Sequence, residues 1–459
     1  MEKAIPRIVI GAPTSNAGKT TVTLALLAAL KETGRKPVSF KCGPDYIDPM
    51  FHSHILGIPS YNLDLFLCGR GEAGANTVRG LFCHHAADAG IAVTEGVMGF
   101  YDGVGISSEA STYDLARTLD APVVLVASAK GAARSICATI KGFAEFESDS
   151  HVAGVILNNC SKSLYAMLAP MIETETGIKP LGYLPKVPEA VIESRHLGLV
   201  TAEEIDGLRA RLAKLGEVAL ESLDLDAIME LGAGAPALEG TLPEVTPVVD
   251  PARAPRIAVA RDKAFCFYYA DNLELLQRLG AKLVEFSPLS DKGLPADIDG
   301  LYLGGGYPEL YEQQLEANSS MRASVCGSVA GGLPTFAECG GFMYLLDELD
   351  GHEMTGALPG SAHGTDRLQR FGYTTLTLTR DTLMGRAGDQ IPAHEFHYWD
   401  STENGDACKA EKASGRSWEC VVANESLWAG FPHLFLYGNP SFAASFVEAC
   451  AAWRARREA

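Results

Sequence analysis

A glycine-rich segment near the amino terminus has the residue types of a phosphate-binding loop. Residues 11–21 read GAPTSNAGKTT and lie between an apolar run and a helical pattern. In such a loop, backbone N–H groups and the first turn of the helix hold the phosphates of a nucleotide. Lys19 would neutralise the β- and γ-phosphate oxygens, and the hydroxyl of Thr20 would bind Mg²⁺. Because Pro13 occupies the position of the usual first glycine, the sequence predicts a variant P-loop.

Three acidic side chains follow other predicted strands. Asp45 and Asp48 lie in the segment GPDYIDP just after one apolar run, and Glu95 directly follows another. Ligands of parallel sheets bind outside the carboxyl ends of the strands, where all three carboxylates would lie. Carboxylate and phosphate oxygens suit Mg²⁺, so these residues are candidate metal ligands. The alternative is that the two aspartates form a turn and the glutamate caps a helix.

A cysteine lies in a glycine-flanked turn in the second half of the chain. Cys339 stands in FAECGG, at the end of an apolar strand-like run. This pattern is typical of a nucleophile elbow, which predicts that the sulfur is exposed and that the following helix lowers the pKa of the thiol. The segment LGGGYPE, with Gly305 and Gly306, could offer N–H donors to a developing oxyanion. The alternative is a buried structural cysteine beside a loop.

A thiolate nucleophile also needs a base. The second half of the chain offers five histidines for this role: His352, His363, His394, His397 and His433. The two histidines of HEFH are three positions apart, so they do not match the zinc motif HExxH. A hydrogen-bonded structural or substrate-facing cluster explains them at least as well. Spacing alone therefore leaves the base open.

The order of the predicted elements places these residues in two α/β domains. Short apolar runs alternate with longer helical stretches, which implies parallel βαβ units with helices on both faces of a sheet. The predicted strands are 7–10, 37–40, 91–94, 123–126, 152–157, 256–260, 282–286, 300–303 and 333–337. We therefore predict a doubly wound parallel sheet that carries the P-loop, followed by a second α/β domain.

Prolines mark the boundary between the two domains. An acidic helical pattern at 201–231 is followed by five prolines: Pro236, Pro243, Pro247, Pro251 and Pro255. Proline propagates neither a helix nor a central strand, so this stretch is interpreted as a linker. We predict a first domain at 1–235, a linker at 236–255 and a second domain at 256–459.

The composition excludes several classes of protein. The chain has 459 residues, 47% hydrophobic and 21% charged, so it is not a disordered chain. Its net charge of −19, from 38 basic and 57 acidic residues, argues against general nucleic-acid binding. Apolar runs reach about nine residues where a membrane span needs about 20, and no secretory signal is recognisable. We expect a cytoplasmic protein, without membrane partners, whose eleven cysteines are thiols.

Several long segments match a known pattern in both sequence and order. They are GAPTSNAGKTT, FKCGPDYIDPMFH, YNLDLF, TEGVMGFYDG, SRHLGL, ARDKAFCFYYADNLELL, LYLGGGYPEL, AECGGFMYL, RLQRFGY and HEFHYWDS. On these segments the chain resembles the cobyrinate a,c-diamide synthase family of the cobalamin pathway. The first half is also similar to dethiobiotin-synthase-like P-loop proteins, and the second half is similar to class I glutamine amidotransferases.

The resemblance implies a reaction for the second domain. Cys339 would attack the side-chain amide of L-glutamine, form a thioester and release ammonia. The family's C-terminal histidine falls on His433, which the resemblance makes the base. The residues that would bind the oxyanion or the glutamine are Gly305, Gly306 and Gly340. Class I enzymes usually continue His-x-Glu, but this chain has Phe435 there, so the orienting carboxylate is absent or supplied elsewhere.

The resemblance also implies that the first domain uses ATP and Mg²⁺. The predicted ATP-binding residues are Thr14, Ser15, Asn16, Ala17, Gly18, Lys19, Thr20 and Thr21. The predicted metal ligands are Thr20, Asp45 and Glu95. The γ-phosphoryl group would pass to the a and c acetate carboxylates of cobyrinate, a corrinoid tetrapyrrole, and ammonia would then displace phosphate. The candidates to hold the substrate or the transition state are Tyr46, Asp48 and Arg195.

Three alternatives to the cobyrinate reaction are open. Ni-sirohydrochlorin and hydrogenobyrinate a,c-diamide synthases run the same reaction on other tetrapyrroles. A protein of a different class would be a P-loop switch ATPase with an inactive amidase domain. Partitioning ATPases of that kind carry a signature lysine where this chain has Thr14, and an inactive amidase would lack the Cys339 elbow. The sequence leaves open whether the chain forms a homo-oligomer.

Overall fold

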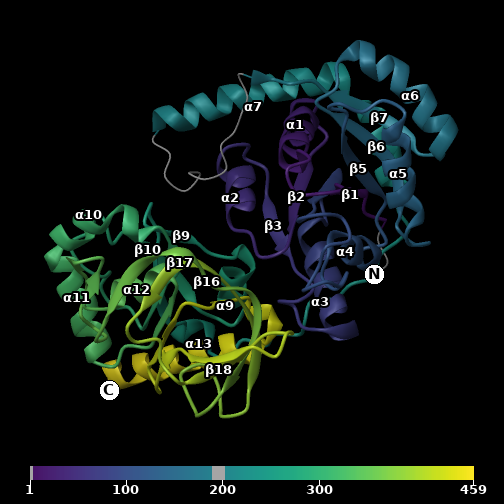
Figure 1. Cartoon of the computed structure of the whole chain (residues 1–459). Coiled ribbons are helices and arrows are strands. Elements are labelled where there is room, and N and C mark those ends of the chain that lie inside the picture. The colour runs from purple at the N-terminus through teal and green to yellow at the C-terminus, as the bar shows by residue number, and fades with distance from the viewer. Residues whose placement is uncertain (1–3, 189–201) are drawn as a thin grey trace. The chain divides into compact units, whose positions relative to one another are not determined.

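Strands and helices alternate along the chain and form two units (Figure 1). The structure, a computed structural model, describes residues 4–188 and 202–459. The amino-terminal unit comprises Met1–Phe66 and Arg70–Leu242, and the carboxy-terminal unit comprises Leu67–Gly69 and Pro243–Ala459. The main boundary, between residues 242 and 243, falls inside the proline-rich stretch. Nothing in the sequence indicated that Leu67–Gly69 would join the second unit.

Seven parallel strands form the sheet of the amino-terminal unit. They are β1 (Arg7–Gly11), β2 (Pro37–Cys42), β3 (Ser60–Leu63), β4 (Ile91–Glu95), β5 (Val123–Ser128), β6 (Val152–Asn158) and β7 (Lys179–Leu184). Their order across the sheet is β3-β2-β4-β1-β5-β6-β7, and every neighbouring pair is parallel. The chain winds from β1 toward one edge and then toward the other. This is the predicted doubly wound sheet, in which ligands bind near the central carboxyl ends.

Helices connect these strands. They are α1 (Lys19–Glu32), α2 (Ile47–His54), α3 (Gly71–His85), α4 (Thr112–Thr118), α5 (Ser135–Glu145), α6 (Lys162–Thr176), α7 (Ala202–Ser222) and α8 (Leu225–Ala233). Helices α1 and α7 lie side by side in Figure 1, and with α8 they bury apolar side chains such as Leu26, Leu212 and Ile228 against the sheet. The acidic pattern at 201–231 proves to be two helices, because Asp224 caps the first turn of α8.

The carboxy-terminal unit is built on a mainly parallel sheet. Its strands are β8 (Arg256–Ala260), β10 (Lys282–Phe286), β11 (Gly300–Leu303), β13 (Thr335–Glu338), β20 (Val422–Ala423) and β21 (Leu427–Gly430). The order is β10-β8-β11-β13-β21-β20, and only the pair of β20 with β21 is antiparallel. All four strands predicted for this half are present. The prediction of a second α/β domain is therefore confirmed.

A second, largely antiparallel sheet in this unit was not predicted. It contains β14 (Glu348–Leu349), β15 (His352–Glu353), β16 (Ser361–Leu378), β17 (Gln390–Ser401), β18 (Cys408–Glu411), β19 (Ser417–Cys420) and β22 (His433–Leu434). The long pair β16 and β17 dominates it, and β22 adds to the far edge of β17. Two short strands, β9 (Phe265–Phe267) and β12 (Gly305–Gly306), pair separately. This sheet includes the predicted base, because β22 begins with His433.

The helices of the carboxy-terminal unit cover the parallel sheet. They are α9 (Ala270–Arg278), α10 (Glu312–Ala317), α11 (Ser319–Ala330), α12 (Gly340–Leu345) and α13 (Pro440–Glu458). Short 3₁₀ helices are η3 (Pro251–Arg253), η4 (Pro308–Leu310) and η5 (Leu436–Gly438). The core includes Leu301, Phe342 and Ala429, all fully buried. Helix α12 follows Cys339 directly, so the core fixes the turn that carries this residue.

All eleven cysteines are free thiols, as predicted from their scattered positions. Among residues 4–188 and 202–459, no helix combines the length and the apolar character that crossing a bilayer requires.

Candidate active sites

The P-loop connects β1 to α1 and is closed by a side chain from β6. Gly18 has a φ of +97°, and a Cβ atom there would lie 1.9 Å from Nδ2 of Asn158. Only glycine fits this position, because a side chain would meet both backbone strain and a collision. Asn158 donates a hydrogen bond of 2.9 Å to the carbonyl of Ala17. The last strand residue of β6 therefore fixes the loop where the phosphates are predicted to bind.

Lys19 and Thr20 begin α1 and face polar groups at the ends of other strands. The hydroxyl of Thr20 donates a hydrogen bond of 2.6 Å to Oε1 of Glu95, the last residue of β4. Nζ of Lys19 donates to the carbonyl of Met98. Burial and the nearby Lys41 lower the pKa of Lys19. The structure thus brings Thr20 into contact with Glu95, two predicted site residues that lie 75 positions apart in the sequence.

Lys41 is a member of this cluster that the sequence analysis missed. Its Nζ lies 2.5 Å from Oδ2 of Asp48 and 3.0 Å from Oε1 of Glu95. Burial alone would lower the pKa of Lys41, but these two carboxylates hold it well above the usual value. Lys41 lies next to the end of β2, so a lysine at the carboxyl end of a predicted parallel strand was the available signal.

Glu95, a predicted metal ligand, is a buried carboxylate with one oxygen that makes no hydrogen bond to any described residue. It is fully buried, and burial raises its pKa to about 7 although Lys41 opposes the rise. Its Oε2 makes no hydrogen bond within the described part of the chain, and Nε2 of His52 lies 3.9 Å away. Burial lowers the pKa of His52 to about 4, so this imidazole is neutral. An unpartnered carboxylate oxygen beside the Thr20 hydroxyl fits Mg²⁺.

Asp45 has the turn-forming contacts that were the alternative to metal binding. Its Oδ1 accepts the N–H groups of Ile47 at 2.7 Å and of Asp48 at 3.3 Å, at the start of α2. Burial and the charge of Asp48 raise the pKa of Asp45. Burial would also raise the pKa of Asp48, but Lys41 holds it below the usual value. One oxygen of Asp45 is committed to the turn, and its role toward Mg²⁺ stays a prediction.

The three predicted substrate-binding residues have different environments. Tyr46 directly precedes α2 and is half-buried. Asp48 is 8% exposed and is held by Lys41, so its carboxylate faces a cation of the protein. Arg195 lies outside the described residues. Their contact with substrate remains a prediction.

A cavity of about 300 Å³ adjoins the P-loop on the side of β5 and α5. Thr14 and Asn16 line it from the loop, and Ser128, Ser135 and Thr139 line it from the other side. Another cavity, of about 480 Å³, is lined by residues such as Asp120 and His151, which precede β5 and β6. Ligands of parallel sheets bind at the carboxyl ends of the strands, so the smaller cavity is the one that belongs to the candidate site.

Cys339 has the backbone geometry of a nucleophile elbow. It lies between β13 and α12 with φ +47° and ψ −103°, an uncommon conformation for a residue with a side chain. A Cβ atom on Gly341 would lie 2.1 Å from the carbonyl oxygen of Leu303, so the turn needs glycine there. The N–H group of Cys339 donates a hydrogen bond of 2.8 Å to the carbonyl of Gly430. Strands β11 and β21 therefore hold the turn from both sides.

The expectation of an exposed sulfur with a lowered pKa is wrong. Cys339 is only 6% exposed, and burial, followed by the charge of Glu309, raises the pKa of its thiol. The N–H group of Gly340 lowers this pKa, but by less than burial raises it. Helix α12 has only six residues, so it supplies little field to oppose the loss of solvation. The resting thiol is therefore protonated.

His433 lies against the glycine loop that was predicted to bind the oxyanion. A Cβ atom on Gly305 would lie 2.6 Å from Cε1 of His433, so the imidazole rests on this glycine. A Cβ atom on Gly340 would lie 3.1 Å from the backbone N of Gly306, so the turn after Cys339 also touches the loop. Burial, followed by the nearby His394, lowers the pKa of His433 to about 3. His433 is therefore a neutral imidazole that can accept a proton.

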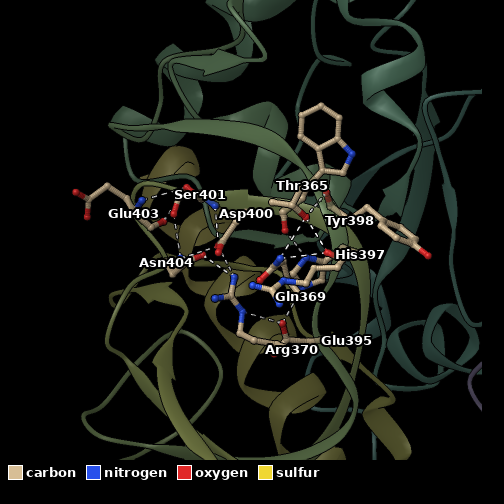
Figure 2. A network of polar contacts seen from close by, with 12 residues as sticks. Thr365, Gln369, Arg370, Glu395, His397, Tyr398, Asp400, Ser401, Glu403 and Asn404 are labelled. Carbon is tan, nitrogen blue, oxygen red and sulfur yellow. Dashed lines mark hydrogen bonds and ion pairs between the residues drawn. The ribbon is translucent and has the colours of Figure 1, made fainter.

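His397 is engaged in a different set of contacts (Figure 2). Its Nδ1 lies 2.6 Å from the carbonyl of Trp399, and its Nε2 lies 2.8 Å from Oε2 of Glu395. Arg370 joins the same cluster through Glu395, at 3.4 Å, and Asp400, at 2.5 Å. Both ring nitrogens of His397 are therefore occupied by acceptors. The HEFH segment is thus part of a hydrogen-bonded cluster. Because His397 is engaged in this cluster, His433 is the better candidate for the base.

The fold and these two sites define a two-domain protein in which a nucleotide-binding P-loop domain is joined to a glutamine amidotransferase domain. Residues 8–199 match the model of the CobQ/CobB/MinD/ParA nucleotide binding domain. Residues 256–440 match the model of the CobB/CobQ-like glutamine amidotransferase domain. Apart from Leu67–Gly69, the first match lies in the amino-terminal unit, and the second match lies in the carboxy-terminal unit.

Relatives that match almost the whole chain identify the family. Proteins named cobyrinate a,c-diamide synthase from Clostridium tetani, Syntrophotalea carbinolica and Methanosarcina acetivorans are 39%, 40% and 39% identical to it. The alignments cover 96%, 97% and 99% of this chain, and 99%, 98% and 97% of the relatives. The chain belongs to the cobyrinate a,c-diamide synthase family. It is therefore a ligase that forms amides with nitrogen from glutamine.

Proposed function

We propose that the chain amidates the a and c acetate carboxylates of cobyrinate in cobalamin biosynthesis, using ATP and glutamine. The observation that carries this proposal is the match, over nearly full length, to relatives named cobyrinate a,c-diamide synthase. The two candidate sites supply the parts that such a reaction needs. One site has groups for phosphoryl transfer, and the other has a nucleophile and a base.

The P-loop site is suited to activating a carboxylate. ATP would lie along residues 14–21, with Lys19 against the phosphates, and the neighbouring cavity lined by Thr14 and Asn16 would take another part of the nucleotide. A substrate carboxylate attacks the γ-phosphorus, ADP leaves, and an acyl phosphate forms. Ammonia then attacks the acyl carbon, phosphate leaves with the bonding electrons, and the surplus proton passes to solvent or phosphate.

Mg²⁺ would be held by Thr20 and Glu95, with Asp45 as the third predicted ligand, and would offset the charge that develops on the phosphate oxygens. Lys41 supports this arrangement because its charge lowers the pKa of Glu95 and so opposes the burial, which favours the protonated form. In phosphoryl transfer, positioning and neutralisation of charge supply most of the catalysis. The buried cluster around Lys41 serves both purposes without itself reacting.

The second site is suited to releasing ammonia from glutamine. The Sγ of Cys339 attacks the amide carbon, and His433 accepts the thiol proton and passes it to the departing nitrogen. N–H groups of the glycine loop and of Gly340 would hold the oxyanion. Water then hydrolyses the thioester. Because the resting thiol is protonated and the resting imidazole is neutral, proton transfer accompanies attack rather than preceding it.

The test is an amidation assay with purified full-length chain, ATP, Mg²⁺ and glutamine. Cobyrinate, hydrogenobyrinate and Ni-sirohydrochlorin are supplied in turn, and ADP release and diamide formation are measured by coupled assay and mass spectrometry. We expect two amides per cobyrinate and the highest kcat/KM for this substrate. A higher kcat/KM with either of the other tetrapyrroles would overturn the choice of substrate. ATP turnover without any amide product would overturn the reaction itself.

A further inference from the structure

A buried glutamate connects the turn of Cys339 to the strand of His433. Glu338 is the last residue of β13 and is 1% exposed. Its Oε1 accepts a hydrogen bond of 2.7 Å from the N–H group of Leu434, and its Oε2 accepts one of 2.8 Å from the hydroxyl of Tyr302. Glu338 directly precedes Cys339, and Leu434 directly follows His433. One side chain therefore links the two candidate catalytic positions through their immediate neighbours.

A second buried side chain holds the same strand from the other direction. Asn272 on α9 is fully buried. Its Nδ2 donates a hydrogen bond of 2.7 Å to the carbonyl of Leu434, and its Oδ1 accepts one of 2.7 Å from the N–H group of Leu436. Both backbone polar groups of Leu434 are thus bound by side chains. Strand β22 has only two residues, so these contacts, with the pairing to β17, determine where His433 lies.

Burying a glutamate at this position is unfavourable in free energy, which argues against a purely structural role. A buried carboxylate needs hydrogen bonds or a cation, and none of the ion pairs in the described part of the chain includes Glu338. Burial raises its pKa to about 8, although the bonds from Leu434 and Tyr302 oppose the rise. An apolar residue would avoid this cost but would leave the N–H group of Leu434 without an acceptor. The acceptor is therefore the property that the position requires.

We propose that Glu338 is a positioning residue for glutamine hydrolysis, which holds β22 so that the imidazole of His433 stays on Gly305 next to the Cys339 turn. The proposal rests on the glutaminase reaction proposed above. In His-x-Glu enzymes the orienting carboxylate follows the histidine, and this chain has Phe435 in that place. Glu338 supplies the orientation through the backbone of the strand. It touches neither glutamine nor the reacting atoms.

The test compares two substitutions of nearly equal volume in the full-length chain. Glu338→Gln keeps an acceptor for the N–H group of Leu434, whereas Glu338→Leu removes it. We expect Glu338→Leu to lower kcat for glutamine-dependent amidation by about 100-fold, because small displacements of a catalytic group cost about that much. KM for glutamine and ammonia-dependent amidation should change less than about twofold. Glu338→Gln should restore kcat to within about threefold of the unsubstituted chain.

A matched control separates positioning from general stability. Asp299 is also fully buried in this unit and accepts the N–H group of Arg256 at 2.9 Å, but it directly precedes β11, away from Cys339 in the sequence. Asp299→Ala should lower the melting temperature without a selective loss of glutamine-dependent activity. If Glu338→Leu does not fold, Glu338→Asp, which withdraws the carboxylate by one methylene, should give a smaller loss with the same selectivity.

Two results would overturn the positioning role. One is a Glu338→Leu chain whose glutamine-dependent kcat is unchanged. The other is a chain that loses glutamine- and ammonia-dependent activity together, in proportion to its unfolded fraction. Failure of the proposed function itself would look different, because the unsubstituted chain would then form no diamide with glutamine.

Discussion

The hydroxyl of Thr20 donates a hydrogen bond of 2.6 Å to Oε1 of Glu95, 75 residues further along the chain. Thr20 lies in the first turn of α1, and Glu95 ends β4, which is the neighbour of β1. Lys41 contacts the same oxygen from next to the end of β2, at 3.0 Å. Two neighbouring strands, β2 and β4, and the first turn of α1 therefore contribute to one polar cluster. Substitution of any one of these side chains therefore changes the electrostatic environment of the other two.

Lys19→Ala should abolish diamide formation with glutamine and with an ammonium salt alike, because both routes need the activated carboxylate. Loss of a charged clamp on the transferring phosphoryl group should cost about 100-fold or more in rate. The measurement is diamide yield with each nitrogen source. Lys31→Ala, at the other end of α1, is the matched control and should be active. Normal ammonia-dependent synthesis by Lys19→Ala would contradict the P-loop assignment.

Glu95→Gln should raise the concentration of Mg²⁺ needed for half-maximal rate and lower the maximal rate about 100-fold, because an amide is a poorer ligand for Mg²⁺ than a carboxylate. Asp45→Asn keeps an oxygen that can accept the N–H groups at the start of α2, so it tests metal binding without disrupting the turn. The measurement is ADP release as a function of Mg²⁺. If the dependence of ADP release on Mg²⁺ is unchanged in both variants, Glu95 and Asp45 have structural roles and do not bind the metal.

Cys339→Ala should eliminate glutamine-dependent amidation but retain ammonia-dependent amidation at high pH. The thiolate acts only in releasing ammonia, so free ammonia bypasses this step and still needs the phosphorylation step. Cys326→Ala, a half-buried cysteine on α11 of the same unit, should retain both activities. If a folded Cys339→Ala chain also loses ammonia-dependent synthesis, the proposed division of labour between the two sites is incorrect.

His433→Ala should show the same selective loss of glutamine-dependent activity, by about 100-fold or more, since proton transfer typically contributes that much. His397→Ala should not, because both nitrogens of His397 are bound by Trp399 and Glu395. The two variants are compared with glutamine and with ammonia as nitrogen source. A selective glutamine defect in His397→Ala alone would move the base to that residue.

The stability of the chain should depend on pH through Glu338. Its pKa is about 8 in the folded chain and about 4.3 in an unfolded chain, so only the unfolded state ionises between these values. The unsubstituted chain should therefore lose stability relative to Glu338→Gln as the pH rises from about 4.3 to about 8, with no further change above that. Urea unfolding of both chains at several pH values measures the difference. A difference that is constant across this range would show that Glu338 does not titrate as described.

The features that could be predicted from the sequence alone are those that short contiguous motifs specify. The P-loop, the Cys339 turn and the order of parallel strands depend on residues that are close together in the chain. Glycine at 18 has a φ of +97°, a local backbone conformation that residues with a side chain rarely adopt. Alternation of strands and helices then restricts the fold to parallel sheets with ligands at the carboxyl ends. For these reasons, the predicted fold class is also the observed one.

Tertiary structure decided which side chains contact one another and which titratable side chains are protonated. The acceptor role of Glu338, the closure of the P-loop by Asn158 and the ion pairs of Lys41 join strands that are distant in sequence, and no spacing rule indicates them. The antiparallel pair β17 and β22 aligns His433 with His394 of the HEFH segment, which is distant from it in the sequence. The raised pKa of Cys339 follows from burial, which depends on the packing of the whole unit. A motif can specify which groups are present, but only packing determines how much solvent and charge surrounds them.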